Sequence, residues 1–93
     1  MRTINLSARF KRDYKREAKG NRGPTLEAEL RAVIELLATD STLPARHHDH
    51  PLAGKWKDYR DCHIRPDLVL IYRLQGADTL DLARLGSHSE LSL

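Results

Sequence analysis

The N-terminal part of the chain carries hydrophobic residues at helical spacing. Ser7 is a suitable N-cap residue and Gly20 a suitable stop signal, so a helix is predicted over residues 8–19. Its apolar stripe consists of residues spaced four apart: Phe10, Tyr14 and Ala18. Most of the basic residues of this segment lie outside the stripe, which indicates an amphipathic helix with one buried side.

A second helix is predicted after a turn at residues 21–24, where Asn, Arg, Gly and Pro follow one another. Thr25 can cap it, and the hydrophobic pattern continues to about Ala38. One face holds the residues with the clearest helical spacing in the chain: Leu26, Leu30, Val33, Ile34 and Leu37. Two amphipathic helices joined by so short a turn are expected to form an antiparallel hairpin.

The C-terminal half alternates between hydrophobic and polar residues, as strands do. The run at 68–74 is apolar on both faces and is therefore expected at the centre of a sheet. It is flanked by two alternating strands, giving an antiparallel meander over 59–64, 68–74 and 79–85. Residues 2–6 are predicted to add a fourth strand at one side, and residues 87–93 form a short tail or helical turn. The predicted fold class is α+β: a helical hairpin packed on a small antiparallel sheet of about four strands.

Residues 39–54 show neither pattern and are predicted to form a long loop. Asp, Ser, Pro and Gly recur in it, and it holds three of the five histidines of the chain. A loop of this length in a small protein is usually either functional or disordered.

Length and composition favour one domain, residues 1–93, in a reducing compartment. The chain has a single cysteine, Cys62, so an intramolecular disulfide is excluded. No run has the length of a membrane span, and basic residues interrupt the N-terminus early, unlike a signal peptide. We therefore expect a cytoplasmic protein without a membrane partner.

Positive charge is concentrated near the N-terminus. Residues 1–24 carry eight basic side chains and two acidic ones, although the whole chain has a net charge of only +3. Six of the basic residues lie on the first predicted helix: Arg9, Lys11, Arg12, Lys15, Arg16 and Lys19. Such a segment either is a solvated helix face or binds a polyanion, and charge alone does not decide between them.

The histidines are the candidate chemical groups. The two-residue period of the strand at 59–64 places Asp61 and His63 on one face, where the carboxylate can orient the imidazole, and Asp67 follows at the turn. A metal site is one alternative, but the spacing of His47, His48 and His50 fits no familiar set of ligands. Taken singly, His47 and His48 are expected to be surface residues of the loop without a role.

Acid–base catalysis on RNA is the third interpretation. Imidazole titrates near neutral pH, so one histidine can accept a proton while another donates one. RNA supplies its own nucleophile, the 2′-hydroxyl, and needs only a base, an acid and nearby cations to stabilise the charged phosphorane. Basic residues lie around the histidines in sequence: Lys55, Lys57, Arg60, Arg65, Arg73 and Arg84. Neither a metal nor a cofactor is required.

The stretch from His50 to Tyr72 closely resembles the YafQ branch of the RelE toxin superfamily. The marks are His-Pro-Leu-Ala-Gly at 50–54, Arg-Asp-Cys-His-Ile at 60–64, Pro-Asp at 66–67 and an apolar strand ending in Ile-Tyr. The segment Arg-Leu-Gly-Ser-His-Ser-Glu-Leu at 84–91 is similar to the C-terminal end of that branch. The resemblance is specific over roughly residues 43–91, whereas the N-terminal helices match only in pattern.

This resemblance implies a RelE-like fold and a toxin of a type II toxin–antitoxin module that cleaves mRNA in the ribosomal A site. The matching positions imply an active site of His50, Asp61, His63, Asp67 and His88. His50 or His63 is expected as the base and His88 as the acid, with the two aspartates orienting imidazoles or positioning RNA. Arg84 is the candidate for phosphate stabilisation, an inference from its charge and position.

The resemblance also implies partners. These are a cognate antitoxin of the DinJ/RelB type, the ribosome and mRNA, with operator DNA contacted only through the antitoxin. The basic first helix, together with Lys55, Lys57, Arg60 and Arg65, is then expected to contact RNA phosphates. Ser92 stands where the family often has a Phe that can stack on a base, so a catalytically weakened RNA-, ribosome- or antitoxin-binding module is the alternative function.

Overall fold

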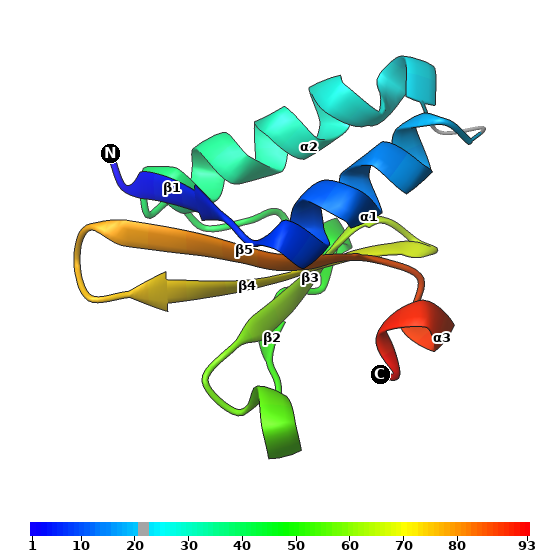
Figure 1. Ribbon diagram of the computed structural model, residues 1–93. Helices are drawn as coiled ribbons and strands as arrows, with labels where there is room; N and C mark the ends of the chain where they lie inside the picture. Colours follow the sequence, from blue (N-terminus) through cyan, green and yellow to red (C-terminus); the bar gives the residue numbers. More distant parts are fainter. Residues whose placement is uncertain (21–22) are drawn as a thin grey trace.

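The computed structural model describes residues 1–20 and 23–93 and has two layers: two helices on one face of a sheet (Figure 1). The predicted turn at 21–24 lies partly outside the described residues. Within them, the elements in chain order are β1 Thr3–Leu6, α1 Ala8–Ala18, α2 Gly23–Ala38, η1 Ala45–His47, β2 His50–Pro51, η2 Gly54–Trp56, β3 Arg60–Arg65, β4 Leu68–Gln75, β5 Thr79–Gly86 and α3 His88–Leu91. No described helix is long and apolar enough to span a membrane.

The two N-terminal helices run antiparallel over one face of the sheet, as predicted (Figure 1). Helix α1 begins where expected, because the side chain of Ser7 accepts a hydrogen bond from the backbone N–H of Phe10 at 2.9 Å. Helix α2 begins two residues before the predicted cap Thr25. A Cβ atom at its first residue, Gly23, would lie 2.2 Å from the carbonyl oxygen of Ala18, so the close approach of the two helices requires glycine there.

The buried side of α1 differs from the predicted stripe. Phe10 is buried, but Ala18 is exposed, and Asp13 and Glu17 are buried instead. The hydrophobic pattern missed these acids because their burial depends on hydrogen bonds from basic side chains, among them Arg84, which lies 71 residues from Asp13 in the sequence. Arg16, Arg84 and the backbone N–H of Leu85 supply hydrogen bonds to Asp13.

The sheet has five strands in the order β1-β5-β4-β3-β2. Strands β3, β4 and β5 form the predicted antiparallel meander, and β2 also pairs antiparallel with β3. Strand β1, however, pairs in parallel with β5, so the expectation of an antiparallel sheet is wrong at this edge. The two residues of β2 were assigned to the loop, because so short a strand shows no alternation. Strand β2 adds the fifth strand at the opposite edge.

The core lies between the helices and one face of the sheet. Strand β4 is buried on both faces, as its sequence predicts: Leu68, Leu70 and Tyr72 pack against the helical side. Val69 and Ile71 face the other side, where they form a smaller cluster with Leu91 of α3. This second cluster holds the C-terminal helix against the sheet face that α1 and α2 leave uncovered.

Candidate active site

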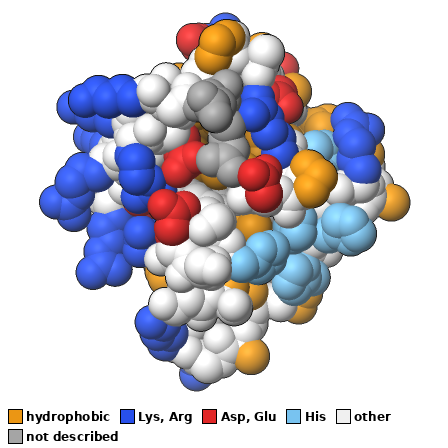
Figure 2. Space-filling model, turned by 90° about the vertical axis from the view of Figure 1, so that its right-hand side faces the viewer, with side chains coloured by type: hydrophobic (Ala, Val, Ile, Leu, Met, Phe, Trp, Pro, Cys, Tyr) orange, Lys and Arg blue, Asp and Glu red, His pale blue; other side chains and the backbone are white. Residues whose placement is uncertain are grey.

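Four histidines and an aspartate converge at one end of the sheet. The rings of His48 and His63 lie 5.3 Å apart between centroids, and those of His63 and His88 lie 5.0 Å apart. His50 Nδ1 is 3.2 Å from Asp61 Oδ1. Figure 2 shows the histidine side chains gathered in one patch of the surface. His50, His63 and His88, which the resemblance implies for one active site, therefore lie together around Asp61.

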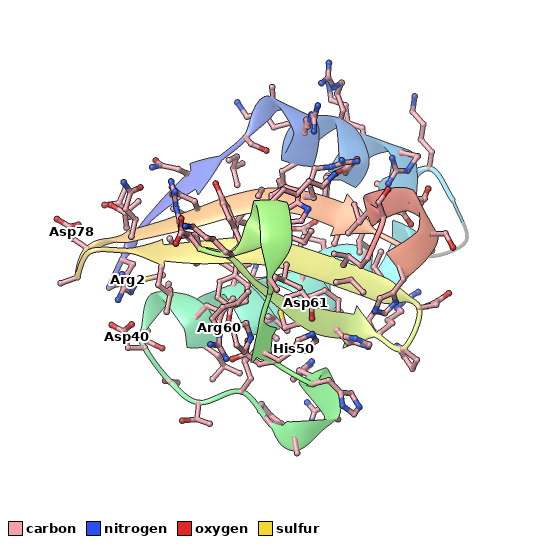
Figure 3. The ribbon with its side chains drawn as sticks, turned by 90° about the horizontal axis from the view of Figure 1, so that it is seen from below. Arg2, Asp40, His50, Arg60, Asp61 and Asp78 are labelled. Carbon is pink, nitrogen blue, oxygen red and sulfur yellow. The ribbon has the colours of Figure 1, made fainter. Side chains whose placement is uncertain are left out.

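Strand pairing brings these residues together. The register places His50 of β2 opposite Asp61 of β3, and the two side chains are labelled in Figure 3. His63 is opposite Val69 of β4, which in turn is opposite Gly86 at the end of β5, two residues before His88. A register shift follows His63 in β3, a local irregularity of the kind often found beside active sites.

Asp61 is the buried centre of the cluster. Its side chain is almost fully buried, and Oδ1 accepts no hydrogen bond from any residue that the structure describes. Burial raises the pKa of Asp61, and the charges of His50, His63 and His88 act in the opposite direction. A buried carboxylate oxygen without a hydrogen bond is costly, and such groups are concentrated at functional sites.

The orientation of His50 is set by the backbone. Its Nδ1 lies 2.7 Å from the carbonyl oxygen of His48. A carbonyl can only accept, so Nδ1 carries the hydrogen in this contact and points it away from the best line to Asp61. The other ring nitrogen, Nε2, is then the acceptor of a neutral His50.

His63 is half-buried within the cluster. Burial lowers its pKa, the positive charge of His88 lowers it further, and Asp61 opposes both. His63 is therefore kept neutral at pH values where a free imidazole begins to protonate, which suits a proton acceptor.

His88 stands at the first turn of α3, and that turn is fixed on both sides. Ser87 and Glu90 form a reciprocal capping box, and Glu90 Oε2 lies 3.4 Å from Arg16 Nε of α1. Leu91 is buried in the second cluster. His88 itself is exposed, so its ring remains accessible to a substrate.

The other two residues of the predicted catalytic set have different surroundings. Asp67 is exposed in the turn between β3 and β4, where its charge acts on Arg65. Arg84 Nε donates to Asp13 Oδ2 at 2.7 Å, so its guanidinium faces α1 in this structure. Their predicted roles toward RNA stay predictions.

The expectation that His47 is a surface residue of the loop is wrong, whereas His48 is exposed as expected. His47 is buried, and its Nδ1 lies 2.6 Å from the carbonyl oxygen of His63, which ties η1 to β3. His48 has a left-handed backbone conformation, with φ of 47°, and its ring extends the row formed by His63 and His88. Isolated loop residues carry no local pattern that would reveal either contact.

The predicted RNA-binding cations divide into two groups. Arg16, Arg60 and Arg65 are engaged in ion pairs, with Asp13, Asp49 and Glu29 respectively. The remaining members are exposed at the surface: Arg9, Lys11, Arg12, Lys15, Lys19, Lys55 and Lys57. Figure 2 shows Lys and Arg side chains along a margin separate from the histidine patch.

The predicted absence of a metal site rested on the poor fit of the histidine spacing. Among the described residues, no group of three or more His, Cys, Asp or Glu side chains is arranged to hold a metal ion.

A family model matches nearly the whole chain. It describes the bacterial toxin of type II toxin–antitoxin systems, YafQ, and matches residues 2–93. The chain belongs to this family. The motifs at residues 43–91 were specific to this family, and the match of the family model also includes the two N-terminal helices.

Relatives within the YafQ family match over similar lengths. The mRNA interferase toxin YafQ of Escherichia coli K12 is 37% identical, covering 97% of this chain and 95% of that protein. A putative toxin YafQ of Haemophilus influenzae is 38% identical, covering 97% and 91% respectively.

Solved structures agree with the fold. The toxin in a crystal structure of the Escherichia coli DinJ–YafQ complex superposes with a TM-score of 0.85 at 37% identity, covering 98% of each chain. A metal-bound toxin from Helicobacter pylori superposes with a TM-score of 0.82 at 41% identity, covering 98% of this chain and 99% of that one.

Proposed function

We propose that this toxin is an mRNA interferase, an endoribonuclease that cleaves RNA by acid–base catalysis without a metal ion. The observation that carries the proposal is the convergence of His48, His50, His63 and His88 on the buried Asp61. The family relationship to proteins named mRNA interferases supports it.

The reaction needs two proton transfers. A neutral imidazole removes the proton of a ribose 2′-hydroxyl, and the 2′-oxygen attacks the adjacent phosphorus. The bond from phosphorus to the 5′-oxygen then breaks, and a protonated imidazole gives its proton to that oxygen. The products are a 2′,3′-cyclic phosphate and a 5′-hydroxyl end, so atoms and charges balance without a further reactant.

The surroundings of the histidines support one assignment of the base and the acid. His63, whose pKa is lowered by burial, is the better base, with His50 as the alternative through its Nε2 atom. His88 is exposed on α3 and is the acid. Asp61 stabilises whichever imidazole becomes protonated, because its buried oxygen has no other hydrogen bond within the described chain.

The decisive experiment maps the ends of cleaved RNA on translated mRNA. We expect a 2′,3′-cyclic phosphate upstream of each cut and undiminished cleavage in the presence of a chelator. Because a related toxin is known in a metal-bound form, the experiment must include protein from which metal has been removed. Cleavage that stops with the chelator and returns on adding a divalent metal would overturn the metal-free mechanism.

Replacing Asp61 should shift the acid limb of the pH–rate profile. The pKa of His63 lies below its ordinary value of 6.5, so activity should rise as pH increases through that lower value. The charge of Asp61 raises the pKa of His63, so Asp61→Asn should move the acid limb to still lower pH. Rate profiles together with an NMR titration of His63 measure this, and a limb that shifts upward would contradict the assignment.

We further propose that the toxin acts on the ribosome and is silenced by a cognate antitoxin, and that the exposed basic face of α1 contacts RNA. Reversing Arg9, Arg12 and Lys15 to Glu should weaken ribosome binding and flatten its salt dependence, because each lost phosphate contact removes roughly 0.7–0.9 from the slope of log K against log salt. Affinities measured over a range of salt concentrations test this. Unchanged ribosome binding by the folded variant would show that α1 does not contact the RNA.

A further inference from the structure

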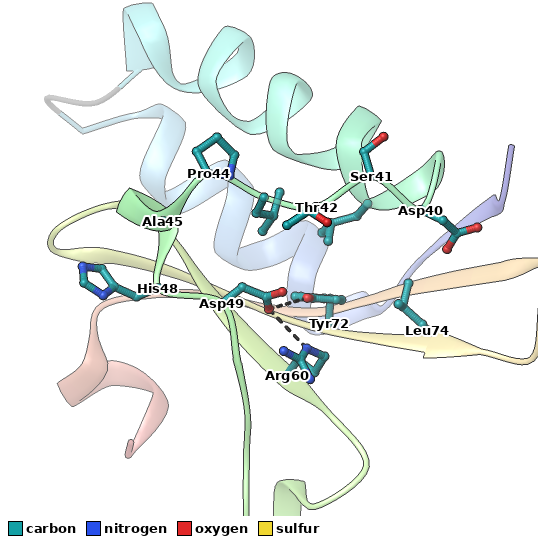
Figure 4. Close-up of a pocket in the computed structure, with 12 residues that line it drawn as sticks. Asp40, Ser41, Thr42, Pro44, Ala45, His48, Asp49, Arg60, Tyr72 and Leu74 are labelled. Carbon is teal, nitrogen blue, oxygen red and sulfur yellow. Dashed lines mark hydrogen bonds and ion pairs between the residues drawn. The ribbon is translucent and has the colours of Figure 1, made fainter.

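A pocket lies on the far side of the segment that carries two of the histidines. It has a volume of about 480 Å³ and lies between the loop at 40–45 and strands β3 and β4. In Figure 4, the ring of His48 points away from the pocket, whereas Asp49 points toward Arg60 and Tyr72 within its lining. His50, which follows Asp49, turns back toward the histidine cluster and contacts Asp61. One short segment therefore separates the pocket from the cluster.

The floor of the pocket is a polar network built on a buried side chain. Tyr72, only 1% exposed, donates its hydroxyl hydrogen to Asp49 Oδ1 at 2.5 Å. Arg60 Nε donates to the same oxygen at 3.2 Å. Figure 4 shows these two contacts meeting at Asp49. Burial of the phenol and the carboxylate beside it raise the pKa of Tyr72, so the hydroxyl stays protonated and keeps Asp49 in place.

This network leaves hydrogen-bonding capacity for a ligand. Asp49 Oδ2 accepts no hydrogen bond from the residues that the structure describes. The guanidinium of Arg60 has five N–H donors and interacts with Asp49 and the Tyr72 hydroxyl, which leaves donors for a ligand, and its side chain is 38% exposed. An acceptor and a charged donor thus lie side by side on the floor.

The walls suit a flat, partly apolar ring. Leu43, Pro44 and Leu74 line the sides, and the volume falls in the range of roughly 300–1,000 Å³ usual for small-molecule sites. Apolar walls with a few convergent polar groups at the bottom are the common design of such sites. The edge of a nucleobase offers a donor beside an acceptor, which complements Asp49 and Arg60.

We propose that this pocket is a nucleobase subsite, which binds one base of the RNA beside the bond to be cut. Asp49 accepts from an amino or imino group of the base, and Arg60 donates to its carbonyl or ring nitrogen. A purine fits best, because adenine and guanine each present a second acceptor at N7 for the guanidinium. The role of the subsite in RNA cleavage rests on the proposed ribonuclease function, whereas the binding of a base does not depend on it.

Asp49→Asn tests the subsite with minimal disturbance. The amide oxygen still accepts from Tyr72 and Arg60, so the segment with His48 and His50 stays anchored, while the free acceptor becomes an N–H₂ donor. Asp40→Asn is the matched control: it is the same acid-to-amide change at the other end of the pocket, where Asp40 pairs with Arg2 at 2.8 Å.

Binding of AMP, GMP, CMP and UMP is followed by NMR on the His88→Ala protein, which keeps the pocket but removes the proposed acid. We expect saturable shifts of Arg60, Tyr72 and Leu74 with a purine nucleotide. Asp49→Asn should abolish this preference or move it to another base, and Asp40→Asn should leave it unchanged.

Cleavage mapping supplies the second readout, with His88 intact. Asp49→Asn should change the base preference at one fixed position from the cut by about tenfold, a step within the usual range for one hydrogen-bonded base contact. Equal loss of cleavage at all sequences, or shifts at the pocket that do not depend on the base, would overturn the subsite. If the wild type cleaves no RNA, the proposed function fails, and the nucleotide titration still decides whether the pocket binds a base.

Discussion

Replacing His88 with alanine should lower the rate of RNA cleavage by roughly 10²–10⁴-fold, the usual contribution of a positioned general acid or base. The capping box of α3 is formed by Ser87 and Glu90, and Leu91 anchors the helix, so the substitution removes the imidazole without removing the helix. Single-turnover cleavage of translated mRNA measures the effect. Binding to the ribosome should change little, because the loss is in the chemical step.

Two controls make this result specific. Ser89→Ala alters the next exposed residue of the same helix and should leave the rate within a factor of about two. Because the charge of His88 lowers the pKa of His63, His88→Ala should also raise that pKa in an NMR titration. Full cleavage by a folded His88→Ala protein would exclude His88 as the acid. No cleavage by the folded wild type would instead favour the alternative of a binding module with weakened catalysis.

The largest effect on stability is expected at Asp13. Asp13 is 4% exposed, and its carboxylate accepts hydrogen bonds from Arg16, Arg84 and the backbone N–H of Leu85. Asp13→Asn leaves Arg84, which is only 20% exposed, without its charged partner. We expect a loss of about 3 kcal/mol in the free energy of unfolding, since breaking a buried ion pair by removing one partner is strongly destabilising. Urea unfolding measures it.

Glu27→Gln is the matched control, because it is also an acid-to-amide change in a helical ion pair, but with both side chains about two-thirds exposed. It should cost less than about 0.5 kcal/mol. An equal loss of unfolding free energy in the two variants would show that the burial of Asp13 does not strengthen its contribution to stability.

The Asp13 network also fixes the direction of a pH effect. Burial alone would raise the pKa of Asp13, but the hydrogen bonds from Arg84 and Leu85 and the charges of Arg84 and Arg16 lower it below 3.8. A carboxyl with a lower pKa in the folded state stabilises the fold above its unfolded pKa, and this stability is lost as pH falls through the folded pKa. The wild type should therefore lose stability below about pH 4, and Asp13→Asn should lose less over the same interval.

Local patterns in the sequence determined most of the secondary structure. The spacing in α2 and the alternation in β3 and β5 record which side of each element is buried, and the continuous apolar run of β4 records that both of its faces are buried. Ser7 marks the start of α1. The order of residues around His50, His63 and His88 also pointed to the site, through likeness to a family. Each of these signals is local or is repeated among relatives, so it can be recognised without knowing the fold.

Only the tertiary structure decided which groups meet. Burial of Asp13 depends on Arg84, 71 residues later, and the parallel pairing of β1 depends on where the chain enters the helical layer. His47 and His48 gain their contacts from β3, and Asp49 gains its own from Tyr72 and Arg60. Such contacts join residues that are far apart in the sequence, so no periodic pattern reveals them. They are fixed by how separate helices and strands pack together, not by the local propensity of any one element.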